Sequence, residues 1–118
     1  MGAPVTWFEV IGKDASKLQS FYSELFGWKL NVIPEMSYGM LESSKKGIGG
    51  GIGAMEQGDG YVTVYAEVDD PQAYLDKAEQ LGGKTVVPVT EMEMVTFAQF
   101  TDPEGHLFGI VKAQNGAG

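Results

Sequence analysis

The side chains that could take part in catalysis or ligand binding lie on two predicted strands. Residues 5–11 and 61–68 are rich in β-branched and aromatic types, which is the composition of strands. Side chains alternate between the two faces of a strand, so residues two apart share a face. On the first strand this face carries Trp7 and Glu9, and on the second it carries Thr63, Tyr65 and Glu67. Each strand is therefore expected to place an aromatic ring beside a carboxylate.

The two carboxylates, Glu9 and Glu67, permit two kinds of chemistry. Burial and mutual repulsion could raise the pKa of one of them, and the pair would then be candidate catalytic groups for general acid–base work. They could instead hold a cationic ligand, with the faces of Trp7 and Tyr65 adding cation–π attraction worth roughly 0.5–2 kcal/mol. The plain alternative is that both carboxylates are solvated strand-end charges and that Trp7 packs in a dimer interface.

The same alternation adds four candidates for the ligand-binding face. They are Phe97 and Gln99 on a predicted strand at about 94–101, and Met36 and Tyr38 on the third predicted strand, whose approximate bounds of 37–43 begin just after Met36. These assignments depend on register, because a shift of one residue moves every side chain to the opposite face.

Composition and charge exclude several classes of protein. The 118 residues predict a single domain without a secretion leader, and no apolar run approaches the roughly 20 residues that span a bilayer. Because the chain has no cysteine, disulfides, thiol catalysis and thiolate metal sites are excluded. The net charge of −8 disfavours nucleic acid as a partner, since phosphate binding needs clustered Lys and Arg. We therefore expect a cytoplasmic protein that binds neither nucleic acid nor membranes.

The first half of the chain predicts one helix among four strands. Asp14 offers a helix N-cap and Gly27 a C-cap. The apolar residues between them lie at i, i+3, i+4 and i+7 on one helical face, at Leu18, Phe21, Tyr22 and Leu25. After the strand at 5–11 and this helix, further strands are predicted at about 28–33, 37–43 and 48–55.

The second half restarts the same pattern. After the strand at 61–68, Asp70 and Pro71 form a strong helix start, and the glycines at 82–83 end the helix. One face of this helix is expected to hold Pro71, Tyr74, Leu75, Ala78 and Leu81. Strands at about 84–88, 94–101 and 107–112 complete the copy. The sequence thus predicts an α+β fold of two β-α-β-β-β modules, at about 5–55 and 61–112.

Several phrases, in order along nearly the whole chain, resemble the signatures of one family. Residues 21–28 read Phe-Tyr-Ser-Glu-Leu-Phe-Gly-Trp, residues 68–71 read Val-Asp-Asp-Pro, and residues 102–110 read Asp-Pro-Glu-Gly-His-Leu-Phe-Gly-Ile. By these phrases the chain resembles the vicinal oxygen chelate superfamily of glyoxalases, bleomycin resistance proteins and dioxygenases. Within it, the chain is similar to the branch of predicted enzymes related to lactoylglutathione lyase. The resemblance implies a homodimer whose modules form a curved mixed sheet with an open cleft.

The resemblance also implies where the metal-dependent members carry their ligands, one each on strands one, four, five and eight. Carried over to this sequence, those positions fall on Trp7, the glycine-rich segment 49–53, Thr63 and Gly109. None of these is a metal ligand of useful strength. The chain's single histidine, His106, follows a turn glycine and is expected to be an exposed hairpin residue. We therefore expect no metal and no cofactor.

Four functions stay open on this basis. The first is a metal-independent small-molecule-binding protein, similar to bleomycin resistance proteins, that sequesters a cationic or aromatic ligand. The second is a metal-free isomerase or lyase that uses Glu9 or Glu67 as a general base. A metal enzyme of the glyoxalase or extradiol dioxygenase type conflicts with the missing ligands. A structural module used only for dimerisation remains, because a fold does not fix a function.

Overall fold

Each half of the chain has the predicted order of elements. The computed structural model describes residues 2–55 and 57–113, and the order β-α-β-β-β occurs twice along them, which confirms the α+β class. By compactness the chain divides into a first unit, residues 7–63, and a second unit, residues 64–118 together with 1–6.

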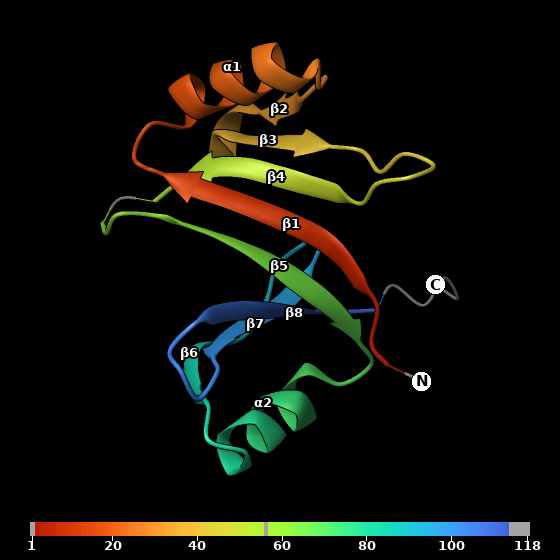
Figure 1. Cartoon of the computed structure of the whole chain (residues 1–118), viewed down its shortest axis with the longest axis vertical. Coiled ribbons are helices and arrows are strands. Elements are labelled where there is room, and N and C mark those ends of the chain that lie inside the picture. The colour runs from red at the N-terminus through yellow and green to blue at the C-terminus, as the bar shows by residue number, and fades with distance from the viewer. Residues whose placement is uncertain (1, 56, 114–118) are drawn as a thin grey trace. The chain divides into compact units, whose positions relative to one another are not determined.

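The first unit places one helix beside a set of four strands. Its strands are ordered β2-β3-β4-β1, and β4 runs parallel to β1 while β2, β3 and β4 are antiparallel neighbours. The helix α1 lies beside β2, β3 and β4 (Figure 1). The elements are β1 (Val5–Gly12), α1 (Ala15–Phe26), β2 (Asn31–Ile33), the short 3-10 helix η1 (Pro34–Met36), β3 (Tyr38–Leu41) and β4 (Gly49–Ala54).

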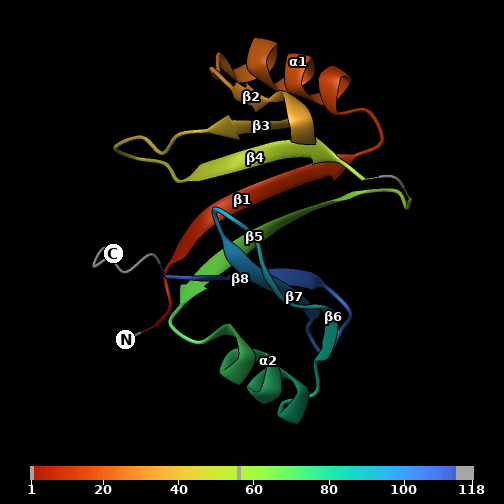
Figure 2. The same cartoon turned by 180° about the vertical axis from the view of Figure 1, so that it is seen from behind.

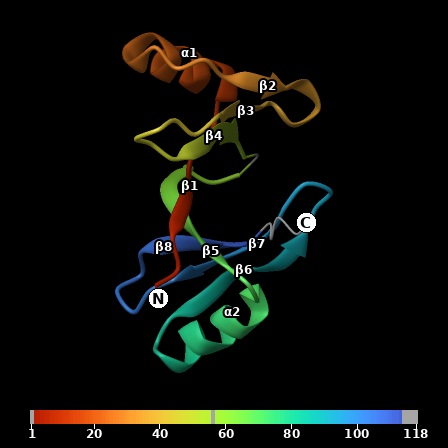
Figure 3. The same cartoon turned by 90° about the vertical axis from the view of Figure 1, so that its right-hand side faces the viewer.

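The second unit repeats this arrangement with its own helix. Its strands are ordered β5-β8-β7-β6, with β5 parallel to β8 and the other neighbours antiparallel. The helix α2 lies next to β6 in two views (Figures 2 and 3). The elements are β5 (Tyr61–Val68), α2 (Pro71–Gln80), β6 (Lys84–Glu91), β7 (Thr96–Thr101) and β8 (Leu107–Lys112). Residues 61–63, at the start of β5, fall within the first unit.

Both helices begin and end at the residues that capping chemistry predicts. The Asp14 carboxylate accepts a hydrogen bond from the Lys17 backbone N–H, which satisfies a donor at the start of α1. Gly27 ends α1 with a φ of 71°, a left-handed conformation that costs glycine little. Asp70 caps α2 in the same way, with Pro71 in the first turn.

Strand alternation separates a helix-covered face from an open face in each unit. In the second unit, Val68, Leu75, Ala98 and Ile110 form a buried cluster under α2, with Ala66 packed against it. In the first unit, the ring of Phe8 meets that of Trp28 at 5.5 Å on the helix side. The side chains at positions 7 and 9 and at 65 and 67 therefore point away from the helices, as the alternation predicts.

Some predicted apolar positions differ from the structure. On the expected inner face of α1, Phe21 and Leu25 are exposed, and on that of α2, Tyr74 and Leu81 are exposed. Met36 is not on a strand but ends the 3-10 helix η1, because Pro34 lacks an N–H and its fixed φ suits a helical first turn. In the described part of the chain, no helix is long and apolar enough to cross a membrane.

Candidate functional site

Glu9 is the centre of a hydrogen-bonded cluster on the open face of the first unit. The Tyr38 hydroxyl donates to Glu9 Oε2 at 2.8 Å, and the Tyr61 hydroxyl donates to Glu9 Oε1 at 2.9 Å. The Trp7 indole N–H donates to the Tyr38 hydroxyl at 3.2 Å. All four residues, which we call the Glu9 cluster, are partly buried. The carboxylate is thus held in one orientation by two hydroxyl groups, beside an indole ring.

Glycine in β4 makes room for this cluster. Glu9 is paired with Gly51 across β1 and β4, and a Cβ added at Gly51 would overlap the ring and hydroxyl of Tyr38. From the sequence alone, the glycines of 47–53 are typical of a strand where backbone approaches backbone closely, or of a bend in the sheet. The structure shows instead that the glycines of β4, which lack side chains, form the surface on which the Tyr38 ring lies.

The environment of Tyr38 favours its neutral form. Burial, and next the negative charge of Glu9, raise the pKa of the Tyr38 hydroxyl far above its usual value. The phenol of Tyr38 therefore keeps its proton and remains a hydrogen-bond donor. A hydroxyl that stays protonated beside a carboxylate is suited to holding that carboxylate in place with its single proton.

This shift predicts a steeper loss of stability at alkaline pH. The unfolded chain releases the Tyr38 proton near pH 10, whereas the folded chain retains it, so the stabilisation is complete below about pH 10 and is lost as the pH rises further. The Tyr38→Phe variant should therefore show a flatter decline of unfolding free energy between about pH 9 and 11. Urea denaturation along a pH series measures this, with Tyr74→Phe, at a tyrosine of α2 that is 43% exposed, as control. Equal slopes for parent and Tyr38→Phe would contradict the assignment.

In the second unit, too, a tyrosine ring lies over a glycine of the neighbouring strand. Tyr65 is 4% exposed, its hydroxyl accepts a 2.7 Å hydrogen bond from the Gln99 amide, and its ring lies edge-on to Phe97 at 6.4 Å. A Cβ at Gly109, which pairs with Tyr65 across β5 and β8, would overlap the Tyr65 ring. Tyr65, Phe97 and Gln99 are thus brought together, with Tyr65 and Gln99 buried.

The remaining candidates are placed separately. Thr63 is buried at 5% exposure, and Glu67 is partly buried on the same strand. Met36 is half-exposed and lines a hollow of about 820 Å³ in the first unit, together with Lys13, Ser37 and Asp59. None of these hollow-lining residues belongs to the Glu9 cluster. The two candidate bases lie in different units, Glu9 in the first and Glu67 in the second.

Tyr61 was missed by the sequence reasoning. It begins β5 and shares the parity of positions 63, 65 and 67, so the alternation used for those residues already places it on the same face. Its hydrogen bond spans 52 residues of sequence, and no local pattern predicts such a pair.

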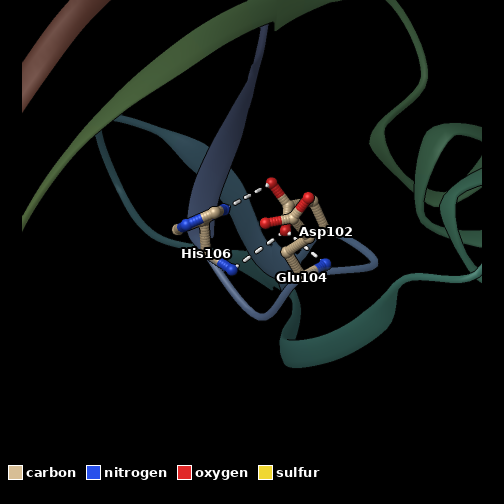
Figure 4. Close-up of polar contacts among 3 residues, drawn as sticks. All are labelled: Asp102, Glu104 and His106. Carbon is tan, nitrogen blue, oxygen red and sulfur yellow. Dashed lines mark hydrogen bonds and ion pairs between the residues drawn. The ribbon is translucent and has the colours of Figure 1, made fainter.

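His106 is exposed, as predicted, and its partner is local. The ring Nδ1 lies 3.1 Å from Asp102 Oδ2, and the other carboxylate oxygen accepts from the backbone N–H groups of Glu104 and His106 (Figure 4). These hydrogen bonds, with that of the His106 backbone N–H largest, lower the pKa of the Asp102 carboxyl. The pair therefore closes the β7–β8 turn and does not belong to the Glu9 cluster.

The residues present do not fit a metal of the kind that the resemblance implies. At the positions carried over, the structure has the Trp7 indole, the buried Thr63 hydroxyl, and glycines covered by the rings of Tyr38 and Tyr65. Across residues 2–55 and 57–113 there is no group of three or more His, Cys, Asp or Glu side chains placed to hold an ion. Indole and covered glycine supply no ligand atom, so these positions would not hold the ion of the metal-dependent members.

Comparison with known proteins gives one family and one fold. Residues 5–110 match the family model described as Glyoxalase/Bleomycin resistance protein/Dioxygenase superfamily. The anthracycline biosynthesis protein DnrV of Streptomyces peucetius is 27% identical over 128 aligned positions, covering 92% of this chain and 46% of that protein. The chain therefore spans about half the length of this curated relative.

Solved structures of the same fold are more distant in sequence. A superfamily member from Vibrio splendidus is similar with a TM-score of 0.63 and 19% identity, covering 95% of this chain and 100% of that one. Methylmalonyl-CoA epimerase from Streptomyces coelicolor gives a TM-score of 0.63 and 14% identity, covering 96% of each chain. At these identities the likeness shows the fold alone.

Proposed function

Because the chain belongs to the Glyoxalase/Bleomycin resistance protein/Dioxygenase superfamily, we propose that it is a metal-independent small-molecule-binding protein that sequesters a cationic, aromatic ligand. The observation that carries this proposal is the Glu9 carboxylate, oriented by the Tyr38 and Tyr61 hydroxyls beside the Trp7 ring. Proteins of this superfamily typically bind small molecules, and this cluster combines a fixed negative charge with aromatic surface.

Physical chemistry links this cluster to a cation rather than an anion. A carboxylate is an acceptor only, with about four lone-pair directions, and the two hydroxyls fix its plane. Aromatic faces attract cations by roughly 0.5–2 kcal/mol and also accept a ligand's apolar surface. The chain's net charge of −8 adds long-range attraction for a positively charged ligand.

The named relative suggests which compounds to try first. Its name ties that protein to anthracycline biosynthesis, and anthracyclines join a planar aromatic ring system to an amino sugar. Such a molecule carries both features that the Glu9 cluster would recognise. Removing the amino sugar leaves an aglycone of the same aromatic shape without the positive charge.

We expect Glu9→Gln to weaken binding of an amino-sugar anthracycline about tenfold, the loss of one partly exposed ion pair. Isothermal titration calorimetry with daunorubicin measures the change. The aglycone should bind parent and Glu9→Gln equally, because it has no charge to lose. Glu104→Gln, which makes the same change in net charge in the exposed β7–β8 turn, serves as the matched control.

Two results would count against the proposal. Equal daunorubicin affinity in parent and Glu9→Gln would remove Glu9 from the site. A melting-temperature rise of several degrees with Ni²⁺, Zn²⁺, Fe²⁺ or Mn²⁺ after EDTA treatment would contradict metal independence, since a ligand at 100 times its Kd adds about 2.7 kcal/mol.

An isomerase or lyase without a metal is the second candidate function. The observation that favours it is the neutral Tyr38 hydroxyl at 2.8 Å from Glu9, which places a donor beside a base. Glu9 would remove a proton from a carbon next to a carbonyl. Once protonated, Glu9 would no longer need the Tyr38 hydrogen bond, and the Tyr38 hydroxyl would turn its single proton to the oxygen that becomes negative. Substrate-dependent exchange of a carbon-bound proton with D₂O, followed by NMR, would separate this candidate from a binding protein. Glu67 is the alternative base in the second unit, and Glu67→Gln is the comparison.

The proposal includes a cytoplasmic homodimer. β2 and β6 end the strand orders of their units, and a strand at a sheet edge leaves backbone N–H and C=O groups unpaired. Closed, symmetric dimers are the commonest way in which soluble chains cover such surfaces. Sedimentation that shows only monomer at high protein concentration would remove this part of the proposal.

A further inference from the structure

The helix α1 exposes large apolar side chains to solvent. Phe21 and Leu25 are each 57% exposed and lie four residues apart in α1. Because an α-helix turns by about 100° per residue, Phe21 faces away from Gln19, two residues before it. The inner side is already used, because Ala15 is 7% exposed and the Gln19 amide donates to the Ile52 carbonyl at 2.9 Å. Large exposed apolar side chains that gather on one face mark an interaction surface.

The ring at the centre of this face is held by its neighbour. Phe21 meets Tyr22 edge-on with ring centroids 5.0 Å apart. Tyr22 in turn stacks on Trp28 at 6.2 Å, which joins the outer face to the aromatic packing under α1. A ring that is already ordered loses little conformational entropy on binding, so its burial contributes more fully to affinity.

Opposite charges flank the apolar centre of the face. Lys17 lies four residues before Phe21 and Glu24 lies three residues after it, so all three share one side of the helix. The ion pairs seen in the described part of the chain join Lys13 to Asp59 and His106 to Asp102, and neither Lys17 nor Glu24 takes part in them. The face is therefore positive at one end, apolar in the middle and negative at the other end.

Such a pattern is complementary to itself. When two copies of α1 pack antiparallel about a two-fold axis near Phe21, Lys17 of each copy meets Glu24 of the other, and the two Phe21 rings meet at the centre. A two-fold interface requires this relation, because each contact between two different residues occurs twice, once in each direction. A parallel arrangement would instead bring like charges together.

We propose that the outer face of α1, made by Lys17, Phe21, Glu24 and Leu25, docks antiparallel on the same face of a second copy of this chain. This inference rests on the homodimer that the proposed function includes and names its interface. A contact of two 12-residue helices is smaller than a standard protein interface, so the dimer is expected to dissociate reversibly on dilution.

A charge-swap cycle tests the pairing directly. Sedimentation equilibrium over a dilution series should give a dissociation constant that rises about tenfold in Lys17→Glu and in Glu24→Lys, because each places two like-charge pairs in the interface. The double variant Lys17→Glu/Glu24→Lys restores both pairs and should return to within about threefold of the parent. Lys46→Glu and Glu104→Lys make the same changes in net charge at exposed positions elsewhere and should leave the constant unchanged.

The apolar centre has its own matched pair of variants. Phe21→Ser should raise the dissociation constant about 100-fold, whereas Leu81→Ser, a comparably exposed apolar position at the end of α2, should not change it. Circular dichroism and melting temperature confirm that each variant is folded. Failure of the double charge swap to restore the dimer, or an unchanged dimer in Phe21→Ser, would overturn the proposed interface.

The outcome separates this inference from the proposed function. Daunorubicin binding is measured in the same variants, none of which alters the Glu9 cluster. Intact binding together with a dimer insensitive to these changes would overturn the α1 interface and leave the ligand site standing. Loss of binding only in Glu9→Gln, with the dimer responding as expected, supports both.

Discussion

Replacing Gly51 with alanine is expected to lower the free energy of unfolding by about 2–3 kcal/mol, the cost of forcing a methyl group into a filled space. The added Cβ would overlap the ring and hydroxyl of Tyr38, and Tyr38 cannot move without losing its hydrogen bonds to Glu9 and Trp7. Glu9 would then lose the Tyr38 hydroxyl that helps to orient it. The same substitution should therefore destabilise the first unit and weaken ligand binding.

A double-mutant cycle shows whether the cost comes from Tyr38. In a Tyr38→Ala background the space over Gly51 is vacated, so adding Gly51→Ala should cost less than about 0.5 kcal/mol. Urea denaturation of the four proteins gives the coupling free energy. Gly47→Ala is the control, since a Cβ there meets only the Ser44 hydroxyl at 3.3 Å. A cost that persists without the Tyr38 ring would show that backbone strain in β4, and not the ring, makes Gly51 necessary.

The sequence alone places the side chains of the site on strands, but it does not predict the contacts between them. The pattern of alternation placed Trp7, Glu9 and Tyr38 on strands and on the open face, because period-two spacing is a local property. It could not show that Tyr38 reaches Glu9, since that contact depends on the pairing of β3 with β4 and β4 with β1. Tyr38 and Glu9 are 29 positions apart in the sequence, and only the folded chain defines such a pair.

The helices show the same division between local and long-range information. Asp14, Gly27, Asp70 and Pro71 set the helix ends by their own chemistry, and these ends were predicted. Which residues of each helix are buried was predicted less well. Apolar residues at helical spacing extend beyond the side of the helix that packs on the strands. Phe21 and Leu25 share the periodicity of buried residues but are exposed to solvent, where they can contribute to the proposed α1 interface.

The difference between a buried and an exposed apolar residue of the α2 region can be measured at two leucines. Leu75 is 2% exposed within the cluster formed with Val68, Ala98 and Ile110, whereas Leu81 is 69% exposed just beyond the end of the helix. Leu75→Ala should lower the free energy of unfolding by about 3 kcal/mol, the sum of lost transfer free energy and an unfilled cavity. Leu81→Ala removes the same atoms from water-exposed surface and should cost less than about 0.5 kcal/mol.

Urea denaturation of both variants, followed by circular dichroism, gives the two costs under identical conditions. Because the sequence places both leucines on one predicted apolar face, periodicity alone would assign them similar values. The expected ratio arises from the tertiary fold, in which Leu75 lies over β5, β7 and β8 while Leu81 follows the last turn of α2. Similar costs for both variants would mean that Leu81 is covered in solution, and a second copy or a ligand would then have to occupy the apolar groove that Leu81 lines with Tyr74 and Phe108.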